Sequence, residues 1–100
     1  MFQENATKSI ENLINQKETI LLDFYASWCV PCQKLMPIVD NFFEQDTNIK
    51  LVKVDVDVYT DLVLKYNIKS FPTLILFKNG QETKRQIGLC TEQELNSFLK

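Results

Sequence analysis

Two cysteines separated by two residues, Cys29 and Cys32, lie at a junction between two different hydrophobic patterns. The run before them, Ile20 to Ala26, is apolar at nearly every position, as in a central strand covered on both faces. The run after them, Pro31 to Gln45, has the spacing of a helix with a broad apolar face. A strand that passes through two thiols into a helix indicates an α/β fold.

The first of the two cysteines is predicted to be the reactive one. If Cys29 lies where the helix begins, the unpaired backbone N–H groups and the positive end of the helix dipole stabilise a thiolate there. Its pKa would then fall from about 8.5 to between roughly 3.5 and 7.5, which makes Cys29 the attacking nucleophile. Cys32, one turn further on, would be shielded, with its Cα about 5–6 Å away, a separation that suits a disulfide. We therefore expect Cys29 to form a mixed disulfide and Cys32 to resolve it.

The residues around the pair favour catalytic use over two structural alternatives. Pro31 is tolerated in the first turn of a helix, and Trp28 would shield one side of the thiol. A structural disulfide across so short a loop removes little entropy from the unfolded chain. A zinc site needs about four ligands, whereas the chain has one further cysteine and no histidine.

Length and charge restrict the domain organisation and the partners. With 100 residues, 45% of them hydrophobic and 24% charged, residues 1–100 are expected to form a single domain. A net charge of −2 with dispersed lysines offers no basic patch, so neither nucleic acid nor a membrane is expected as a partner. The start of the chain lacks a signal-peptide pattern, and we expect a cytoplasmic protein in which the thiols are kept reduced. A mature secreted form would also lack its signal.

The first half of the chain alternates helix-like and strand-like segments. Thr7 to Gln16 is predicted to be an amphipathic helix, and only Phe2 hints at a strand before it. Ile49 to Val58 is predicted to be a strand, and Thr60 to Tyr66 a short helix that ends at Asn67. This order predicts a parallel βαβαβ arrangement. In the predicted strand from Ile49 to Val58, one face carries Val52, Val54, Val56 and Val58, and the other carries Lys53, Asp55 and Asp57.

The second half contains stronger local signals. Phe71-Pro72 breaks the chain before an apolar strand, Thr73 to Phe77. Asn79-Gly80 predicts a hairpin turn into a polar edge strand, Glu82 to Ile87, so the last two strands should be antiparallel. Thr91 to Glu94 has the pattern of a capping box that opens a C-terminal helix.

Taken together, these segments resemble the thioredoxin family, in order and in spacing, over nearly the whole chain. The resemblance implies an α/β thioredoxin fold, with a central mixed sheet of four to five strands flanked by helices on both faces. It implies a monomer with no bound cofactor or metal that reduces disulfides in protein substrates and is itself reduced by thioredoxin reductase with electrons from NADPH. The motifs that carry it are Asp23-Phe24-Tyr25-Ala26, Trp28-Cys29-Val30-Pro31-Cys32, Pro37, Lys53-Val54-Asp55-Val56-Asp57, Phe71-Pro72-Thr73, Lys78-Asn79-Gly80 and Gly88.

The resemblance also implies roles for residues outside the cysteine pair. Asp23 matches a buried carboxylate behind the second cysteine that takes and returns its proton, and burial would raise its pKa towards neutrality. Lys53 matches a lysine near that carboxylate. Pro72 matches a proline with a cis peptide bond that faces the disulfide. Alternatively, Asp23 is an acid bonded to backbone at a strand end, and Lys53 a solvated strand residue.

A docking surface for substrates is implied around Cys29. The backbone of Phe71 would pair with an extended substrate segment, as an added strand does. Gly88 matches a glycine that lets a neighbouring loop approach closely. The apolar surface would be formed by Trp28, Val56, Phe71 and Leu89, with Val30 and Pro31 of the cysteine loop beside it. Core packing for Val56 and incidental exposure for Leu89 are the alternatives.

Several positions depart from the family pattern. Val30 stands where glycine is usual, Phe71 where a smaller residue is usual and Tyr25 where tryptophan is frequent. Cys90 has no counterpart and is expected to be a small buried residue rather than a regulatory thiol. A specialised periplasmic reductase of the cytochrome c maturation type and a non-catalytic binding module are the competing interpretations. A glutaredoxin is disfavoured because no basic glutathione-binding pattern is present.

Overall fold

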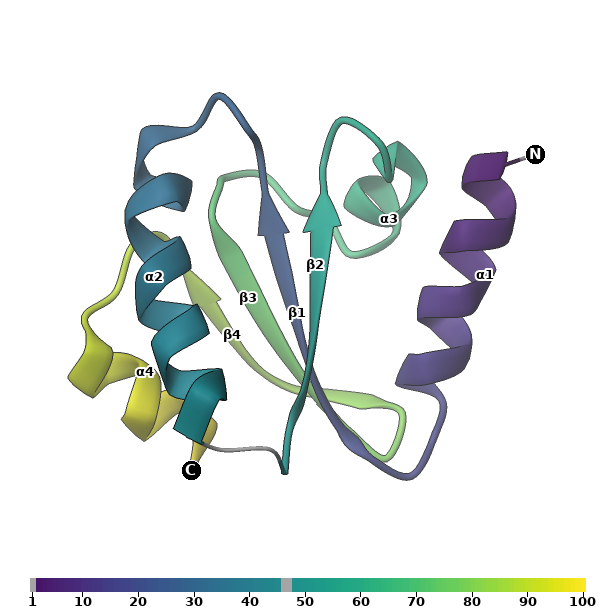
Figure 1. The fold of residues 1–100 in the computed structure, drawn as a ribbon. Helices are drawn as coiled ribbons and strands as arrows, with labels where there is room; N and C mark the ends of the chain where they lie inside the picture. Colours follow the sequence, from purple (N-terminus) through teal and green to yellow (C-terminus); the bar gives the residue numbers. More distant parts are fainter. Residues whose placement is uncertain (1, 46–47) are drawn as a thin grey trace.

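Four strands in the described part of the chain form one mixed sheet, in the order β2-β1-β3-β4 (Figure 1). The computed structural model describes residues 2–45 and 48–100. β1 lies between β2, which is parallel to it, and β3, which is antiparallel. The expected thioredoxin-type mixed sheet is therefore confirmed, with four strands. The elements are α1 (Phe2–Ile14), β1 (Thr19–Tyr25), α2 (Val30–Gln45), β2 (Lys50–Asp55), α3 (Thr60–Lys65), β3 (Thr73–Lys78), β4 (Gln81–Ile87) and α4 (Glu92–Leu99).

Helices cover both faces of the sheet, α1 and α3 on one side and α2 and α4 on the other (Figure 1). Each side has its own cluster of buried apolar residues. On the first side, Ile10 and Ile14 of α1 and Leu62 of α3 pack with Phe24 of β1. On the second side, Leu35 and Val39 of α2 and Leu95 and Leu99 of α4 pack with Leu21, Leu74 and Leu76.

The central strand β1 separates these two clusters by the alternation of its side chains. Ile20, Leu22 and Phe24 belong to the α1–α3 side, and Leu21 to the α2–α4 side. The same alternation places Asp23 on the side that α2 covers. Residues 20 to 24 are all buried. The strand predicted from the apolar run is confirmed, and it carries one carboxylic acid into the interior.

The direction of β3 differs from the parallel βαβαβ order expected of the first three strands. β3 pairs with β1 in antiparallel register, with Leu22 opposite Ile75. The helix before it, α3, has six residues and therefore rises only about 9 Å. It lies near the end of the sheet at which β1 and β2 finish (Figure 1), so the chain enters β3 from that end. The prediction of a parallel third strand was wrong because α3 stays at that end of the sheet and does not carry the chain back to the end where β1 and β2 begin.

Two further predicted boundaries are corrected. The second strand ends at Asp55, because the side chain of Asp55 accepts a hydrogen bond from the Asp57 N–H at 2.9 Å and turns the chain. Val58 therefore lies beyond the strand and is 43% exposed. The helix expected from Thr7 to Gln16 is α1, which begins at Phe2, so the hint of a strand there was wrong. No proline or glycine interrupts residues 2–6, and the helical backbone extends through them.

The turn and cap signals in the second half of the chain are confirmed. Asn79 and Gly80 both have positive φ, 52° and 83°, as a two-residue hairpin turn requires. Asn67, after α3, also has a positive φ of 55°. In the capping box the Thr91 hydroxyl accepts from the Glu94 N–H at 3.1 Å, and Glu94 accepts from the Thr91 N–H at 2.9 Å.

Candidate active site

Cys29 directly precedes α2, and its disulfide to Cys32 closes across the first turn of that helix. The carbonyl of Cys29 accepts the first helical bond from Gln33 N–H, and its Sγ accepts from the Cys32 N–H at 3.3 Å. The two Cα atoms are 5.3 Å apart, as the spacing predicted. A sulfur that already accepts a backbone N–H at a helix N-terminus is well placed to carry negative charge.

The loop before β3 faces this disulfide. The Phe71–Pro72 peptide bond is cis, as the resemblance implied. The carbonyl oxygen of Phe71 lies 3.7 Å from Sγ of Cys29. The loop is held from both sides, because the Thr73 hydroxyl donates to the Ser70 carbonyl at 2.7 Å and the Gly88 N–H donates to the Pro72 carbonyl at 2.8 Å.

Gly88 has a different reason to be glycine from the one expected. A Cβ built at this position meets nothing within 4 Å, so no neighbouring loop packs closely where a side chain would be. The Pro72 loop does approach Gly88, but at its backbone N–H and not where a Cβ would lie. Gly88 has a φ of +89°, a backbone conformation that residues with a Cβ disfavour. This conformation directs its N–H to the Pro72 carbonyl.

Trp28 is exposed to 65% but is held in place by two contacts. Its indole N–H donates to Oδ2 of Asp57 at 3.0 Å. Its ring meets the ring of Phe71 edge to face, with 6.0 Å between centroids. Asp57 was named in the sequence only as part of a predicted strand and a family motif and was given no role there; the signal for it was an acid just past the end of β2, where the cysteines lie.

An apolar groove of about 320 Å³ adjoins the cysteine loop on the α3 side. It brings together three of the residues expected in the docking surface, Trp28, Val56 and Phe71. Val56 also packs in the core and is only 6% exposed, whereas Leu89 is 46% exposed and is not among the groove residues. Val30, in the cysteine loop, is 58% exposed. The full lining is Trp28, Val56, Asp57, Thr60, Val63, Leu64 and Phe71.

Asp23 is only 5% exposed, and this burial raises its pKa to about 6. Lys53, its partner in the parallel β1–β2 register, acts in the opposite direction and lowers the pKa. Asp40, on α2, raises it. Cys32 lies in the first turn of the same helix, which covers the face that Asp23 occupies. A buried carboxyl that changes charge near neutral pH is able to exchange a proton with a cysteine thiol.

A model of the thioredoxin family matches residues 2–100 of this sequence. The chain belongs to the thioredoxin family. It is 36% identical to thioredoxin of Mycoplasma genitalium over 88 residues, which cover 88% of this chain and 86% of that protein. It is 36% identical to thioredoxin-1 of Saccharomyces cerevisiae over 86 residues, covering 86% and 84%. Family members of this kind are protein-disulfide reductases, and this chain is a thiol-disulfide oxidoreductase whose reactive pair is Cys29 and Cys32.

Solved thioredoxin structures have the same fold. The oxidised form of mitochondrial thioredoxin 3 from Saccharomyces cerevisiae superposes with a TM-score of 0.84 at 30% identity, covering 92% of this chain and 86% of that one. Thioredoxin of Plasmodium falciparum gives a TM-score of 0.86 at 30% identity, covering 92% and 89%.

Cys90 packs in a different buried cluster from Cys29 and Cys32 in this thioredoxin-family fold. It is 3% exposed and packs with Leu21, Leu95 and the other apolar residues on the α2–α4 side. Burial, with a smaller effect of Glu94, raises its thiol pKa. The expectation of a small buried residue is therefore confirmed, and a thiol with a raised pKa is a poor nucleophile.

No three side chains of the metal-binding types cluster within residues 2–45 and 48–100. In the same residues, no helix has the length and apolar character to cross a membrane.

Proposed function

We propose that Cys29 is the nucleophile and Cys32 the resolving thiol of a general protein-disulfide reductase. The Cys29 thiolate attacks one sulfur of a substrate disulfide and releases the other as a thiolate. Cys32 loses its proton and attacks Sγ of Cys29, which frees the second substrate sulfur and leaves the pair oxidised. The observation that carries the proposal is the Cys29–Cys32 disulfide, which opens α2 and lies against the loop of Phe71 and Pro72.

Asp23 serves the second of these steps. Its buried carboxyl has a pKa of about 6, so at neutral pH it is mainly charged but takes up a proton readily. We assign to it the acceptance of the Cys32 proton during resolution and its return during reduction, with Lys53 tuning the charge. This role predicts that resolution slows as the carboxyl becomes protonated below pH 6.

Substrates dock where backbone and apolar surface meet beside Cys29. The Phe71 backbone, at the edge of the cis-proline loop, pairs with an extended segment, and Pro72 shapes that loop. Trp28, Val56 and Phe71 hold an apolar side chain of the substrate in the groove. Val30, Pro31, Gly88 and Leu89 border the same region.

The electrons come from NADPH through a thioredoxin reductase, and the protein itself holds no cofactor. Residues 1–100 act as a single domain and as a monomer in the cytoplasm, where electron transfer to protein disulfides maintains redox balance. No observation on this structure favours the periplasmic specialist or the non-catalytic module over this role.

The test combines three measurements: recycling of the protein by its reductase, trapping of the mixed disulfide, and the reduction potential of the cysteine pair. Purified protein is incubated with thioredoxin reductase, NADPH and a disulfide-containing protein, and NADPH oxidation is followed for the parent, Cys29→Ser and Cys32→Ser. We expect turnover only in the parent, and a stable mixed disulfide to the substrate only in Cys32→Ser. A reduction potential of about −270 mV for the cysteine pair is expected of a general reductant. Undiminished turnover by Cys29→Ser would refute the proposal, and a potential tens of millivolts higher with poor recycling would point to a specialised role.

A further inference from the structure

Three charged side chains connect the buried strand β1 to the surface of α2. Asp23 and Lys53 are register partners across the parallel β1–β2 pair, so their side chains leave the sheet on the same face. Lys53 Nζ forms a salt bridge with Oδ1 of Asp40 at 2.9 Å. The lysine therefore lies between two carboxyl groups, one inside the protein and one on the helix that covers it.

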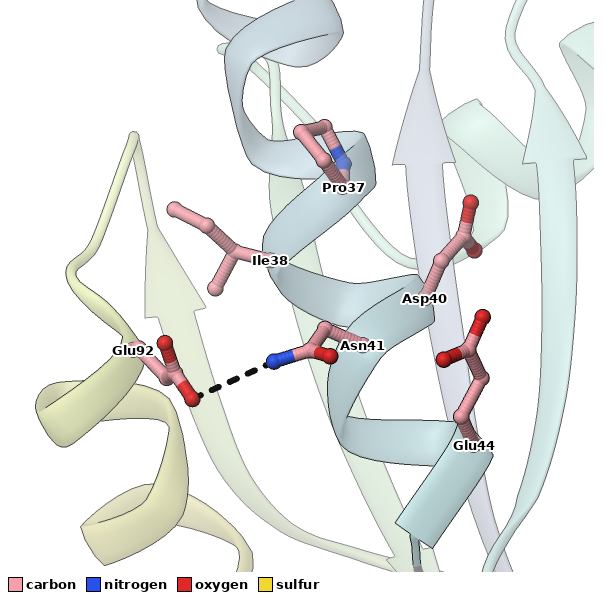
Figure 2. Close-up of a pocket in the computed structure, with 6 residues that line it drawn as sticks. All are labelled: Pro37, Ile38, Asp40, Asn41, Glu44 and Glu92. Atoms are coloured by element: carbon pink, nitrogen blue, oxygen red, sulfur yellow. Dashed lines mark hydrogen bonds between the residues drawn. The ribbon is translucent and has the colours of Figure 1, made fainter.

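Asp40 reaches Lys53 because of its position on α2. It lies eight residues after Cys32 and four after Met36, and positions with this spacing follow one side of a helix. Figure 2 shows Asp40 on the side of α2 that faces β1 and β2, with Glu44 one turn further along the same side. Ile38 and Asn41 extend the other way, and the Asn41 amide donates to Glu92 of α4 at 3.3 Å.

The two carboxyl groups differ sharply in their environment. Asp23 is only 5% exposed, whereas the side chain of Asp40 is 47% exposed and that of Lys53 35%. An ammonium group has three donors on a flexible chain and can shift between acceptors within its reach. A hydrated carboxylate at the surface binds it without desolvating either charge fully, whereas pairing with Asp23 would draw the ammonium inwards.

We propose that Asp40 is a positioning residue, which holds the Lys53 ammonium at the surface, prevents it from pairing with Asp23, and thereby acts on proton transfer at Cys32. This inference rests on the function proposed above for Asp23. It gives a role to Asp40, an acid on α2 that lies outside the family motifs and does not contact the reacting sulfurs.

The charges around Asp23 agree with this arrangement. Lys53 from β2 lowers its pKa, and Asp40 from α2 raises it. Its partner on β3 is Leu74, which is apolar. Tyr25, two residues along β1, has a phenol whose pKa is raised by burial and by the acids near it, so it stays neutral at physiological pH. Loss of Asp40 removes a negative charge and releases Lys53, and both changes favour the charged form of Asp23.

The test is a titration of the Asp23 carboxyl by carbon-detected NMR in the oxidised protein, in which neither cysteine of the pair titrates. The variants are Asp40→Asn, Lys53→Met, the double variant, and Glu44→Gln as a control on the same side of α2. We expect Asp40→Asn to lower the Asp23 midpoint by about 1 pH unit and Glu44→Gln to leave it unchanged. With Lys53→Met already present, Asp40→Asn should have less than half of this effect.

An equal shift with and without Lys53 would overturn the proposal, because Asp40 would then act by its own charge alone. No shift in Asp40→Asn would overturn it too. Unfolding midpoints within error of the parent exclude a structural cause. The rate at which the mixed disulfide is resolved should be measured as a function of pH. In Asp40→Asn the midpoint of this pH profile should lie at lower pH by the same amount. If the titrations behave as expected but Asp23→Asn resolves at the parent rate, the inference on Lys53 stands and the proton role of Asp23 fails.

Discussion

The carbonyl oxygen of Phe71 lies 3.7 Å from Sγ of Cys29, although the two residues are 42 positions apart in the chain. The backbone before Pro72 therefore lies beside the sulfur that a substrate disulfide must reach. This proximity places a stretch of loop backbone beside a reactive atom, and the rings of Phe71 and Trp28 add apolar surface next to it.

Phe71→Ala should weaken the binding of protein substrates. The change removes one wall of the apolar groove and the edge-to-face contact with Trp28, worth about 0.5–1.5 kcal/mol. We expect KM for a protein disulfide to rise about two- to tenfold with kcat nearly unchanged. Steady-state kinetics with a small disulfide as the comparison substrate check this, because a small disulfide does not fill the groove. Equal losses for the two substrates would contradict a docking role.

Asp57→Ala should loosen Trp28. The indole N–H loses its acceptor at 3.0 Å, and because the bond is exposed we expect a cost in stability of about 1 kcal/mol or less. The main effect should be on mobility, seen as lower fluorescence anisotropy of Trp28 and easier quenching by iodide. Asp57→Asn keeps a side-chain oxygen and is the matched control. If both variants leave the Trp28 fluorescence unchanged, the bond does not position the ring.

Asp23→Asn should stabilise the protein at neutral and alkaline pH but not in acid. The folded pKa, about 6, lies above the ordinary value of 3.8, so the favourable contribution of the protonated carboxyl is complete below about pH 4 and is lost as the pH rises through 6. The charged carboxylate then costs about 3 kcal/mol. Urea unfolding of the oxidised protein should show this gain at pH 8 and almost none at pH 4. A gain independent of pH would have another cause.

Gly88→Ala should destabilise the protein through backbone strain alone. The residue has φ of +89° and open space where a Cβ would lie, so the expected cost is about 1–2 kcal/mol without a steric clash. Gly88→Asn should cost less, because asparagine tolerates positive φ, as it does at Asn67 and Asn79. Chemical denaturation of the two variants checks this. An alanine variant as stable as the parent would show that the loop adjusts freely.

The amino-acid sequence by itself determined the features that depend on neighbouring residues. The apolar run around Phe24 predicts a buried strand, Asn79-Gly80 predicts the hairpin, and the capping box predicts the start of α4. Cys29 and Cys32 are three positions apart, so their closeness follows from helix geometry alone. The resemblance carried by these motifs then pointed to the cis bond at Pro72 and to the buried acid at Asp23.

Only the tertiary structure decided the relations between segments that are distant in the chain. The salt bridge of Asp40 to Lys53, the bond from Trp28 to Asp57 and the antiparallel direction of β3 all depend on how helices and strands pack. No local pattern records such contacts, because many registers and directions satisfy the same periodicity. The chemistry of the cysteine pair could therefore be predicted from the sequence, whereas the charges and surfaces around the pair are defined only by the packing of helices and strands in the tertiary structure.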